Sequence, residues 1–203
     1  RRLTEEKLWY LANFDPLTGL PNRVLFRDRL EHALKTARRD GRLVGLVFSD
    51  LDDFKRVNDL HGHQAGDRVL RAIAGALRAA VRTSDVVARY GGDEFVVVMP
   101  ETDEAESRSV AERAEAAVAH LRHPMPDGSE VQVSCSVGLA LHPRDGRTGK
   151  ELLRAADSQM YRHKRSRGRQ GRRPGGSRAV SVSQPNAAQV PVLQAAQEPT
   201  VKA

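Results

Sequence analysis

The sequence predicts an α+β fold in which a mainly antiparallel sheet is flanked by helices. Its apolar and turn patterns give the order helix-helix-strand-helix-helix-strand-strand-helix-strand-helix, with a βααββαβ core close to the ferredoxin-like arrangement. Strand-like runs at 85–89 and 95–99 have a short connection, which is typical of an antiparallel hairpin. The 203 residues, 39% of them hydrophobic, can bury the core of one domain with additional tails.

The two ends of the chain differ in composition from its centre. Residues 1–13 have helical character but form too short a helix to be stable alone, so they could link an upstream domain or pack as a frayed end. The chain starts without Met, which favours a linker helix from a missing upstream domain. Residues 14–170 are then the folded domain. Residues 171–203, rich in Pro, Gly, Ser, Gln and Ala, are predicted to be disordered.

Residues 15–22 form a loop that is punctuated by prolines and a glycine. Taken alone, Asp15 and Asn22 are a turn residue and a helix cap. The following helix has apolar residues at helical spacing and is expected to end before Gly41.

A short apolar run at 43–49 predicts a buried central strand. Three carboxylates follow at its end, Asp50, Asp52 and Asp53. Crowded carboxylates repel one another unless a cation lies among them, and Mg²⁺ prefers oxygen ligands, so Asp50 is a metal candidate. Asp52 and Asp53 could instead cap the next helix, which is the preferred interpretation for Asp53.

The next helix begins at Phe54, breaks around Gly62 and is followed by a second helix over 65–80. Lys55 could neutralise phosphate charge. Asn58 and Asp67 flank the break and could meet one base. A carboxylate matches the N1–H and 2-amino donors of guanine, which adenine lacks as a pair.

The hairpin connection contains Gly91 and Gly92, for which positive φ angles are predicted. Asp93 and Glu94 should point to opposite sides of the hairpin, because strand side chains alternate. The glycine backbone could accommodate a phosphate chain that carries a metal. The alternative is a surface turn whose acids only keep it soluble.

The remaining domain is predicted to contain three elements. Asp103 caps a helix that reaches about residue 121, a strand covers 131–141, and a last helix covers 149–165. Cys135 should lie on the buried face of that strand, and as a single cysteine it cannot form an internal disulfide, which suits a reducing, cytoplasmic environment. No apolar run of about 18 residues exists in the sequence. The full-length protein could still be membrane-anchored.

The net charge of +7 does not indicate a basic binding face on the folded domain. Residues 162–178 hold eight basic residues and no acidic one, so the rest of the chain is close to neutral. No aromatic residue lies among them, as a base-stacking platform would require. RNA or membrane association through the tail stays an alternative, and no specific nucleic acid is expected as a partner. Deleting 171–203 would abolish binding by such a tail and leave a domain-borne activity.

Several motifs together resemble one family. They are Asp-Pro-Leu-Thr-Gly-Leu-Pro-Asn-Arg (15–23), Asp-Leu-Asp-Asp-Phe-Lys-Arg-Val-Asn-Asp (50–59), His-Gly-His-Gln-Ala-Gly-Asp (61–67), Arg-Thr-Ser-Asp (82–85), Arg-Tyr-Gly-Gly-Asp-Glu-Phe (89–95) and Ser-Val-Gly-Leu-Ala (136–140). In this order and spacing they resemble the GGDEF domains, the diguanylate cyclases that join two GTP molecules into cyclic di-GMP. The predicted core also suits the palm domains of nucleotide cyclases and polymerases.

The resemblance implies a site for GTP and Mg²⁺, with Mn²⁺ as a possible substitute. Its implied metal ligands are Asp50, the Leu51 carbonyl, Asp93 and Glu94, and its implied catalytic residues are Asp93, Glu94 and Lys55. Implied substrate-binding residues are Asn58, His63, Asp67, Gly91, Gly92 and Lys164. The family pattern places an arginine four positions after the lysine, but this chain has Gly168 there, flanked by Arg167 and Arg169. Which of the two arginines contacts phosphate stays open.

Arg82 and Asp85 match the RxxD product-inhibition site of the family. Without the resemblance, Arg82 would compensate the partial negative charge of a helix C-terminus, and Asp85 would be a turn residue. Arg113 could add a second inhibitory contact, although an exposed helix residue is the simpler interpretation. The implied partners are a second copy of the chain, since each domain would hold half of the site, and an upstream sensory domain. The alternative within the family is a module that binds GTP or cyclic di-GMP without turnover.

Overall fold

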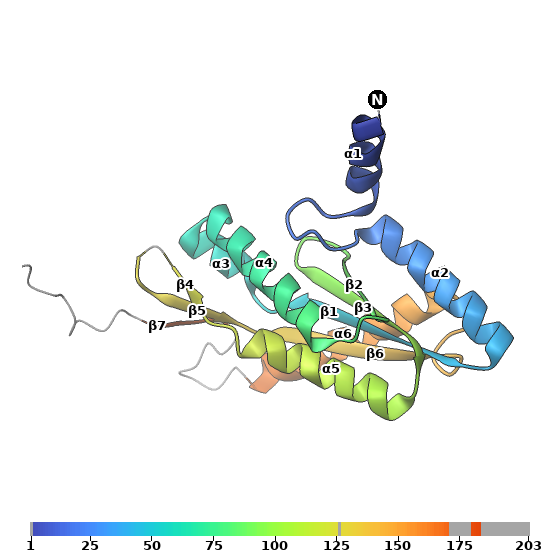
Figure 1. Cartoon of the computed structure of the whole chain (residues 1–203). Helices are drawn as coiled ribbons and strands as arrows, with labels where there is room; N and C mark the ends of the chain where they lie inside the picture. Colours follow the sequence, from blue (N-terminus) through green and yellow to red (C-terminus); the bar gives the residue numbers. More distant parts are fainter. Residues whose placement is uncertain (1, 126, 171–179, 184–203) are drawn as a thin grey trace, which may run out of the picture.

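The computed structural model describes residues 2–125, 127–170 and 180–183 (Figure 1). Its elements, in chain order, are α1 (Arg2–Asn13), α2 (Arg23–Asp40), β1 (Leu43–Leu51), α3 (Phe54–His61), α4 (His63–Ala80), β2 (Val86–Arg89), β3 (Glu94–Thr102), α5 (Glu104–Ala119), β4 (His123–Pro124), β5 (Glu130–Val133), β6 (Cys135–His142), α6 (Gly149–Gln170) and β7 (Val180–Ser183).

The main sheet has the strand order β2-β3-β1-β6, and all of its neighbouring strands are antiparallel. β1 therefore lies inside the sheet between β3 and β6. Its last residues pair with both neighbours, since Asp50 lies opposite Glu94 on one side and opposite Ser136 on the other. The predicted α+β class, the antiparallel sheet and the βααββαβ order are confirmed.

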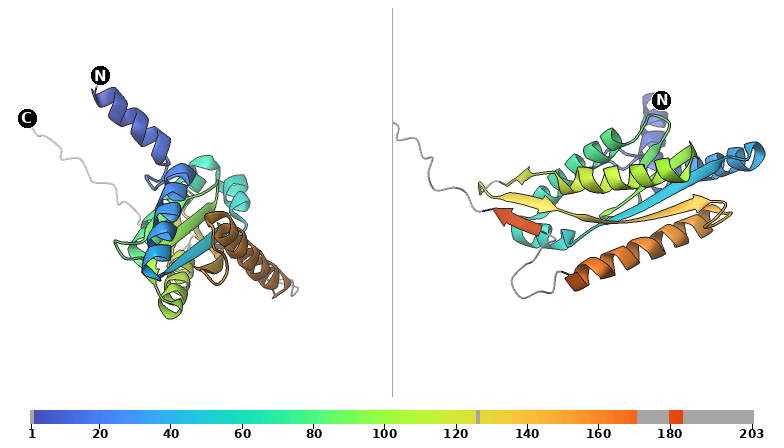
Figure 2. Two further views of the ribbon diagram at one scale, coloured as in Figure 1. Left: turned by 90° about the vertical axis from the view of Figure 1, so that its right-hand side faces the viewer. Right: turned by 90° about the horizontal axis from the view of Figure 1, so that it is seen from below.

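Helices cover both faces of this sheet, as the two views of Figure 2 show. On one face, alternate residues such as Val47 of β1 and Val97 of β3 pack with α3, α4 and α5. On the other, Phe48 and Val96 pack with α2 and α6. Burial on both faces explains why these strands read as continuous apolar runs rather than as alternating ones.

The strand predicted over 131–141 is interrupted at Ser134. Its first part, β5, leaves the main sheet and joins β4 and β7 in a small second sheet. The interruption accompanies a connection to the end of β1. There the Asp52 N–H donates to the Ser134 carbonyl (2.8 Å), and the Ser134 hydroxyl donates to the Asp52 carboxylate (2.7 Å).

Near the C-terminus, the observed elements differ from the predicted ones. α6 continues to Gln170, beyond its predicted end at 165. Residues Val180–Ser183 lie in the segment predicted to be disordered but form β7, antiparallel to β5, so the prediction does not hold for these four. Residues 171–179 and 184–203 lie outside the described part of the chain. α1 projects away from the sheet (Figure 1). Its Leu8 and Leu11 side chains are exposed. None of the described helices has the length and apolar character needed to cross a membrane.

The helix caps follow the sequence in two cases and depart from it in a third. The Asn22 side chain accepts the N–H groups of Val24 and Leu25, and Asp103 accepts that of Glu106, so both predicted caps are confirmed. Asp53 stands at the N-cap position of α3, but its side chain makes no capping hydrogen bond there. Its φ of 53° is left-handed, so the predicted capping role is wrong.

Candidate active site

Residues 90–93 connect β2 to β3. This connection is longer than the two-residue hairpin turns whose central residues need positive φ angles. It closes through the N–H of Tyr90, which donates to the Glu94 carbonyl (2.9 Å). Within the described residues, the positive-φ glycines are Gly19, Gly41, Gly62 and Gly128. The positive φ predicted for the glycine pair of this loop is therefore wrong, because a longer connection spreads the chain reversal over more residues.

Arg89 holds this loop against the loop at 15–22. Its Nε and Nη2 donate to the Gly92 carbonyl (3.1 and 2.7 Å), and its Nη1 donates to both carboxylate oxygens of Asp15 (3.0 and 3.1 Å). Burial opposes ionisation of Asp15, but hydrogen bonds from Thr18 and Arg89 outweigh it and lower the pKa of Asp15. The sequence interpretation assigned no role to Arg89, although it opens the signature heptapeptide.

Carboxylates from β1 and from the hairpin lie close together. Asp50 is opposite Glu94, and the N–H of Leu51 donates to the Asp93 carbonyl (3.2 Å). Burial raises the pKa of Glu94, and the charges of Asp50, Asp93 and Asp157 raise it further. Burial also raises the pKa of Asp50, although Lys164 opposes that shift. The site thus gathers negative charge at the end of β1.

The ammonium of Lys164, on α6, contacts the Asp50 carboxylate. Burial lowers the pKa of Lys164, but Asp50 and its acidic neighbours outweigh burial and raise it. Among the described residues, no three Asp, Glu, His or Cys side chains converge in an arrangement ready to hold a metal. The oxygen donors and their mutual repulsion nevertheless fit a hard divalent cation, which would take over part of the compensation that Lys164 provides.

A cavity of about 360 Å³ lies beside these carboxylates, a size typical of small-molecule sites. It is open to solvent and bordered by helices α3 and α4 and by the hairpin. Its lining residues are Phe54, Lys55, Asn58, His63, Asp67, Leu70, Arg89, Gly92 and Asp93. The structure therefore brings together six of the predicted site residues in this cavity. Five others lie outside the lining. Gly91 and Glu94 belong to the same chain segment as Asp93, and the contacts described above connect Leu51 to Asp93, Asp50 to Glu94 and Lys164 to Asp50.

Gly66 is a further residue of this site that the sequence interpretation missed. A Cβ atom at this position would lie 2.0 Å from the Asn58 Oδ1. The bare backbone therefore leaves room for the Asn58 amide between α3 and α4. A glycine directly before Asp67, inside a helix where glycine is otherwise unfavourable, was the available signal.

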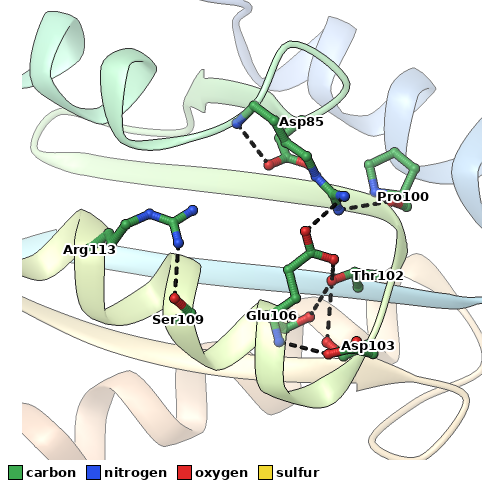
Figure 3. A network of polar contacts seen from close by, with 9 residues as sticks. Asp85, Pro100, Thr102, Asp103, Glu106, Ser109 and Arg113 are labelled. Atoms are coloured by element: carbon green, nitrogen blue, oxygen red, sulfur yellow. Dashed lines mark hydrogen bonds and ion pairs between the residues drawn. The ribbon is translucent and has the colours of Figure 1, made fainter.

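Arg82 and Asp85 form an internal pair just before β2, at the end of the β2–β3 hairpin opposite to the 90–93 loop. The Arg82 Nε donates to Asp85 Oδ1 (3.2 Å), and its Nη1 lies 2.8 Å from Glu106 Oε1. Burial raises the pKa of Asp85 despite its bonds from Arg82. Figure 3 shows Glu106 between Asp85 and Thr102, and Arg113 further along α5 with its guanidinium on Ser109. The exposed Arg113 also donates to the Ala80 carbonyl (3.1 Å), which ends α4.

Comparisons with known proteins agree with this geometry. A family model described as "Diguanylate cyclase, GGDEF domain" matches residues 12–170. The chain is 45% identical over 166 residues to the bifunctional diguanylate cyclase/cyclic di-GMP phosphodiesterase MucR of Pseudomonas aeruginosa, which covers 81% of this chain and 24% of MucR. It is 41% identical over 169 residues to the diguanylate cyclase TpbB of the same species, covering 81% of this chain and 38% of TpbB.

Solved structures show the same fold. The GGDEF domain of TpbB from Pseudomonas aeruginosa is 42% identical with a TM-score of 0.72, over 75% of this chain and 89% of that one. The coiled coil and GGDEF domain of DgcB from Caulobacter crescentus, in complex with c-di-GMP, is 29% identical with a TM-score of 0.74, over 81% and 87%. The chain spans about a quarter of the length of MucR and about two fifths of TpbB.

Proposed function

The chain belongs to the GGDEF family, and from this premise we propose that it is a diguanylate cyclase that joins two GTP molecules into cyclic di-GMP and releases two pyrophosphates. The observation that carries the proposal is the cavity in which Asn58, Asp67 and Lys55 meet Asp93, beside the crowded carboxylates of β1 and β3. The cavity offers groups for a base, and its neighbours offer groups for a metal-bound triphosphate.

Guanine recognition is assigned to Asn58 and Asp67. The Asp67 carboxylate accepts the N1–H and 2-amino groups, and the Asn58 amide meets the remaining edge. His63 lines the same cavity and is placed near the substrate. Gly66 preserves the position of the Asn58 amide, as its missing Cβ shows. Adenine presents no such donor pair to Asp67, so GTP is preferred over ATP.

The triphosphate is assigned to the other end of the site. Asp50, the Leu51 carbonyl, Asp93 and Glu94 would hold one or two Mg²⁺ ions, with Mn²⁺ as a substitute. Bound there, the metal supplies positive charge for the phosphate oxygens. Lys55 and Lys164 are the chain's own cations for the phosphates. The 3′-hydroxyl oxygen of one GTP bonds to the α-phosphorus of the other as the bond to pyrophosphate breaks, and Glu94, whose pKa is raised by burial and its acidic neighbours, assists loss of the hydroxyl proton.

One chain supplies one such half-site, so two copies must face each other for both bonds to form. An upstream sensory domain in the full-length protein is expected to control how two copies meet. The direct test of the activity is to incubate the purified chain with GTP and Mg²⁺ and identify products by chromatography. Cyclic di-GMP with two equivalents of pyrophosphate is expected, whereas GDP and phosphate as the products would contradict the proposal.

Gly91 and Gly92 are expected to affect different kinetic constants. A Cβ at Gly91 would lie 2.3 Å from Glu94 Oε2, whereas one at Gly92 meets nothing within 4 Å and faces the cavity that GTP would occupy. Gly91→Ala should therefore displace the Glu94 carboxylate and lower kcat, and Gly92→Ala should mainly raise the KM for GTP. Steady-state kinetics of both variants check this. An unchanged kcat in Gly91→Ala would contradict the assigned contact.

Product inhibition is assigned to Arg82 and Asp85. Arg82→Ala should leave the initial rate of turnover intact and weaken inhibition by added cyclic di-GMP, because the guanidinium that binds the product is lost. Arg108→Ala is the control, since Arg108 is an exposed arginine on the neighbouring α5 that pairs with Glu104 (3.2 Å). The measurement is an inhibition curve for each variant. Superimposable curves for Arg82→Ala and wild type would rule out the assignment.

A further inference from the structure

Arg167 lies one position before the site at which the family pattern has its arginine. In this structure its guanidinium makes hydrogen bonds and ion pairs within the protein. Its Nη1 donates to the Cys135 carbonyl at the start of β6 (2.8 Å), and its Nη2 pairs with the Glu115 carboxylate of α5. Nη1 also lies 3.5 Å from Asp52 Oδ2. One guanidinium thus joins α6, α5, β6 and the end of β1.

Asp52 is the member of this group that lies nearest to the proposed metal ligands. Its carboxylate accepts the hydroxyls of Ser134 and Ser136 (2.7 Å each), and its N–H donates to the Ser134 carbonyl. The residue is 8% exposed, so these hydroxyl groups and Arg167 take the place of water as partners of its carboxylate. A buried carboxylate with this many donors has one preferred position.

The segment that Asp52 anchors contains the proposed ligands on one side and a strained residue on the other. Asp50 and Leu51 precede it, and Asp53 follows with a left-handed φ of 53°. A non-glycine residue in that region is strained, and it persists only where its surroundings determine the backbone. The bonds to Asp52 provide that determination, and they act on the peptide that carries the Leu51 carbonyl.

We propose that Arg167 is a positioning residue for the divalent-cation site, acting through Asp52 on Asp50 and the Leu51 carbonyl, rather than a ligand of the GTP phosphates. The proposal rests on the proposed function for the identity of the metal ligands. It explains how this chain can use an arginine at 167 differently from the family's phosphate-binding arginine. The side chain of Arg169, the other flanking arginine, lies outside the described part of the chain.

The test is Mn²⁺ binding measured by electron paramagnetic resonance in the presence of 3′-deoxy-GTP, which lacks the attacking hydroxyl and so cannot turn over. Arg167→Gln should weaken Mn²⁺ binding by roughly tenfold, the lower end of the range for groups that orient metal ligands. The affinity for 3′-deoxy-GTP at saturating Mn²⁺ should be unchanged. Arg162→Gln, an exposed arginine of the same helix, should match wild type.

Two further variants keep the result decisive if Arg167→Gln does not fold. Arg167→Lys, which keeps a positive charge beside Asp52, should recover part of the Mn²⁺ affinity, and Glu115→Gln, which loosens Arg167 from α5, should show a smaller loss than Arg167→Gln. Wild-type Mn²⁺ affinity in every one of these variants that folds would overturn the proposal. So would weaker binding of 3′-deoxy-GTP with unchanged Mn²⁺ affinity, since that pattern identifies a phosphate ligand. Wild type that binds Mn²⁺ but makes no cyclic di-GMP would refute the proposed function instead.

Discussion

Glu94→Gln is expected to lower the turnover of GTP by at least about a hundredfold, the effect typical of losing a positioned proton-transfer group, while the domain stays folded. Glu94 lies opposite Asp50 across β1 and β3, and the charges of Asp50, Asp93 and Asp157 act on its carboxylate. Glutamine has nearly the same shape but no negative charge, so it can neither bind a cation well nor accept a proton. Asp93→Ala should be comparably inactive, because Asp93 is a proposed metal ligand and also lines the cavity.

The stability of the Glu94→Gln variant provides an independent check. Burial and neighbouring carboxylates raise the folded-state pKa of Glu94, so the native state binds this proton more tightly than the unfolded state does. Glu94 therefore destabilises the fold increasingly as pH rises through its ordinary range towards its raised pKa. Removing the charge should leave stability at neutral pH unchanged or slightly higher.

The control is Glu101→Gln, which removes an exposed carboxylate from the same strand away from the cavity. The measurements are initial rates of cyclic di-GMP formation and urea unfolding curves at neutral pH. Turnover within tenfold of wild type in Glu94→Gln would show that this carboxylate has no catalytic role. A large loss of stability would show that the activity loss arises from the fold.

Gly138→Ala is expected to destabilise the domain by about 3 kcal/mol, the upper end of the usual cost of overpacking. Gly138 lies on β6, opposite Phe48 of β1. A Cβ there would lie 2.0 Å from the Ala156 carbonyl oxygen and 2.4 Å from the Met160 nitrogen. These are backbone atoms of α6, which cannot rotate aside, so the helix that carries Lys164 must shift away from the sheet.

Gly75→Ala is a matched control of opposite sign. Gly75 is exposed on α4, and nothing lies within 4 Å of its added Cβ, so alanine should stabilise the helix by about 1 kcal/mol. Urea unfolding of both variants gives the free energies of unfolding. A Gly138→Ala protein as stable as wild type would mean that α6 does not pack on β6 as closely as this structure shows.

Local patterns predicted the parts of the molecule whose interactions are local in sequence. The break at Gly62 placed Asn58 and Asp67 on two adjoining helices, and the structure puts both side chains in one cavity. Continuous apolar runs identified β1 and β3, because both faces of each strand are buried. The caps at Asn22 and Asp103 depend only on neighbours within three residues.

The features that sequence did not predict depend on contacts between distant residues. The bonds from Ser134 and Ser136 to Asp52 span 82 and 84 positions, and they explain why the strand at 131–141 is interrupted and why Asp52 is not a cap. The bridge from Arg89 to Asp15 spans 74 positions. No periodic pattern encodes such pairs, because each depends on how the finished sheet brings its strand ends together.

We propose that one chain carries one half-site, so that two chains must meet before cyclic di-GMP forms. This requirement is tested most directly by the rate of cyclic di-GMP formation per chain as protein concentration is varied, with the mass of the particle followed by light scattering on the same samples. The rate per chain should rise with concentration in step with the dimer fraction. A constant rate per chain at concentrations where light scattering shows only monomer would contradict it.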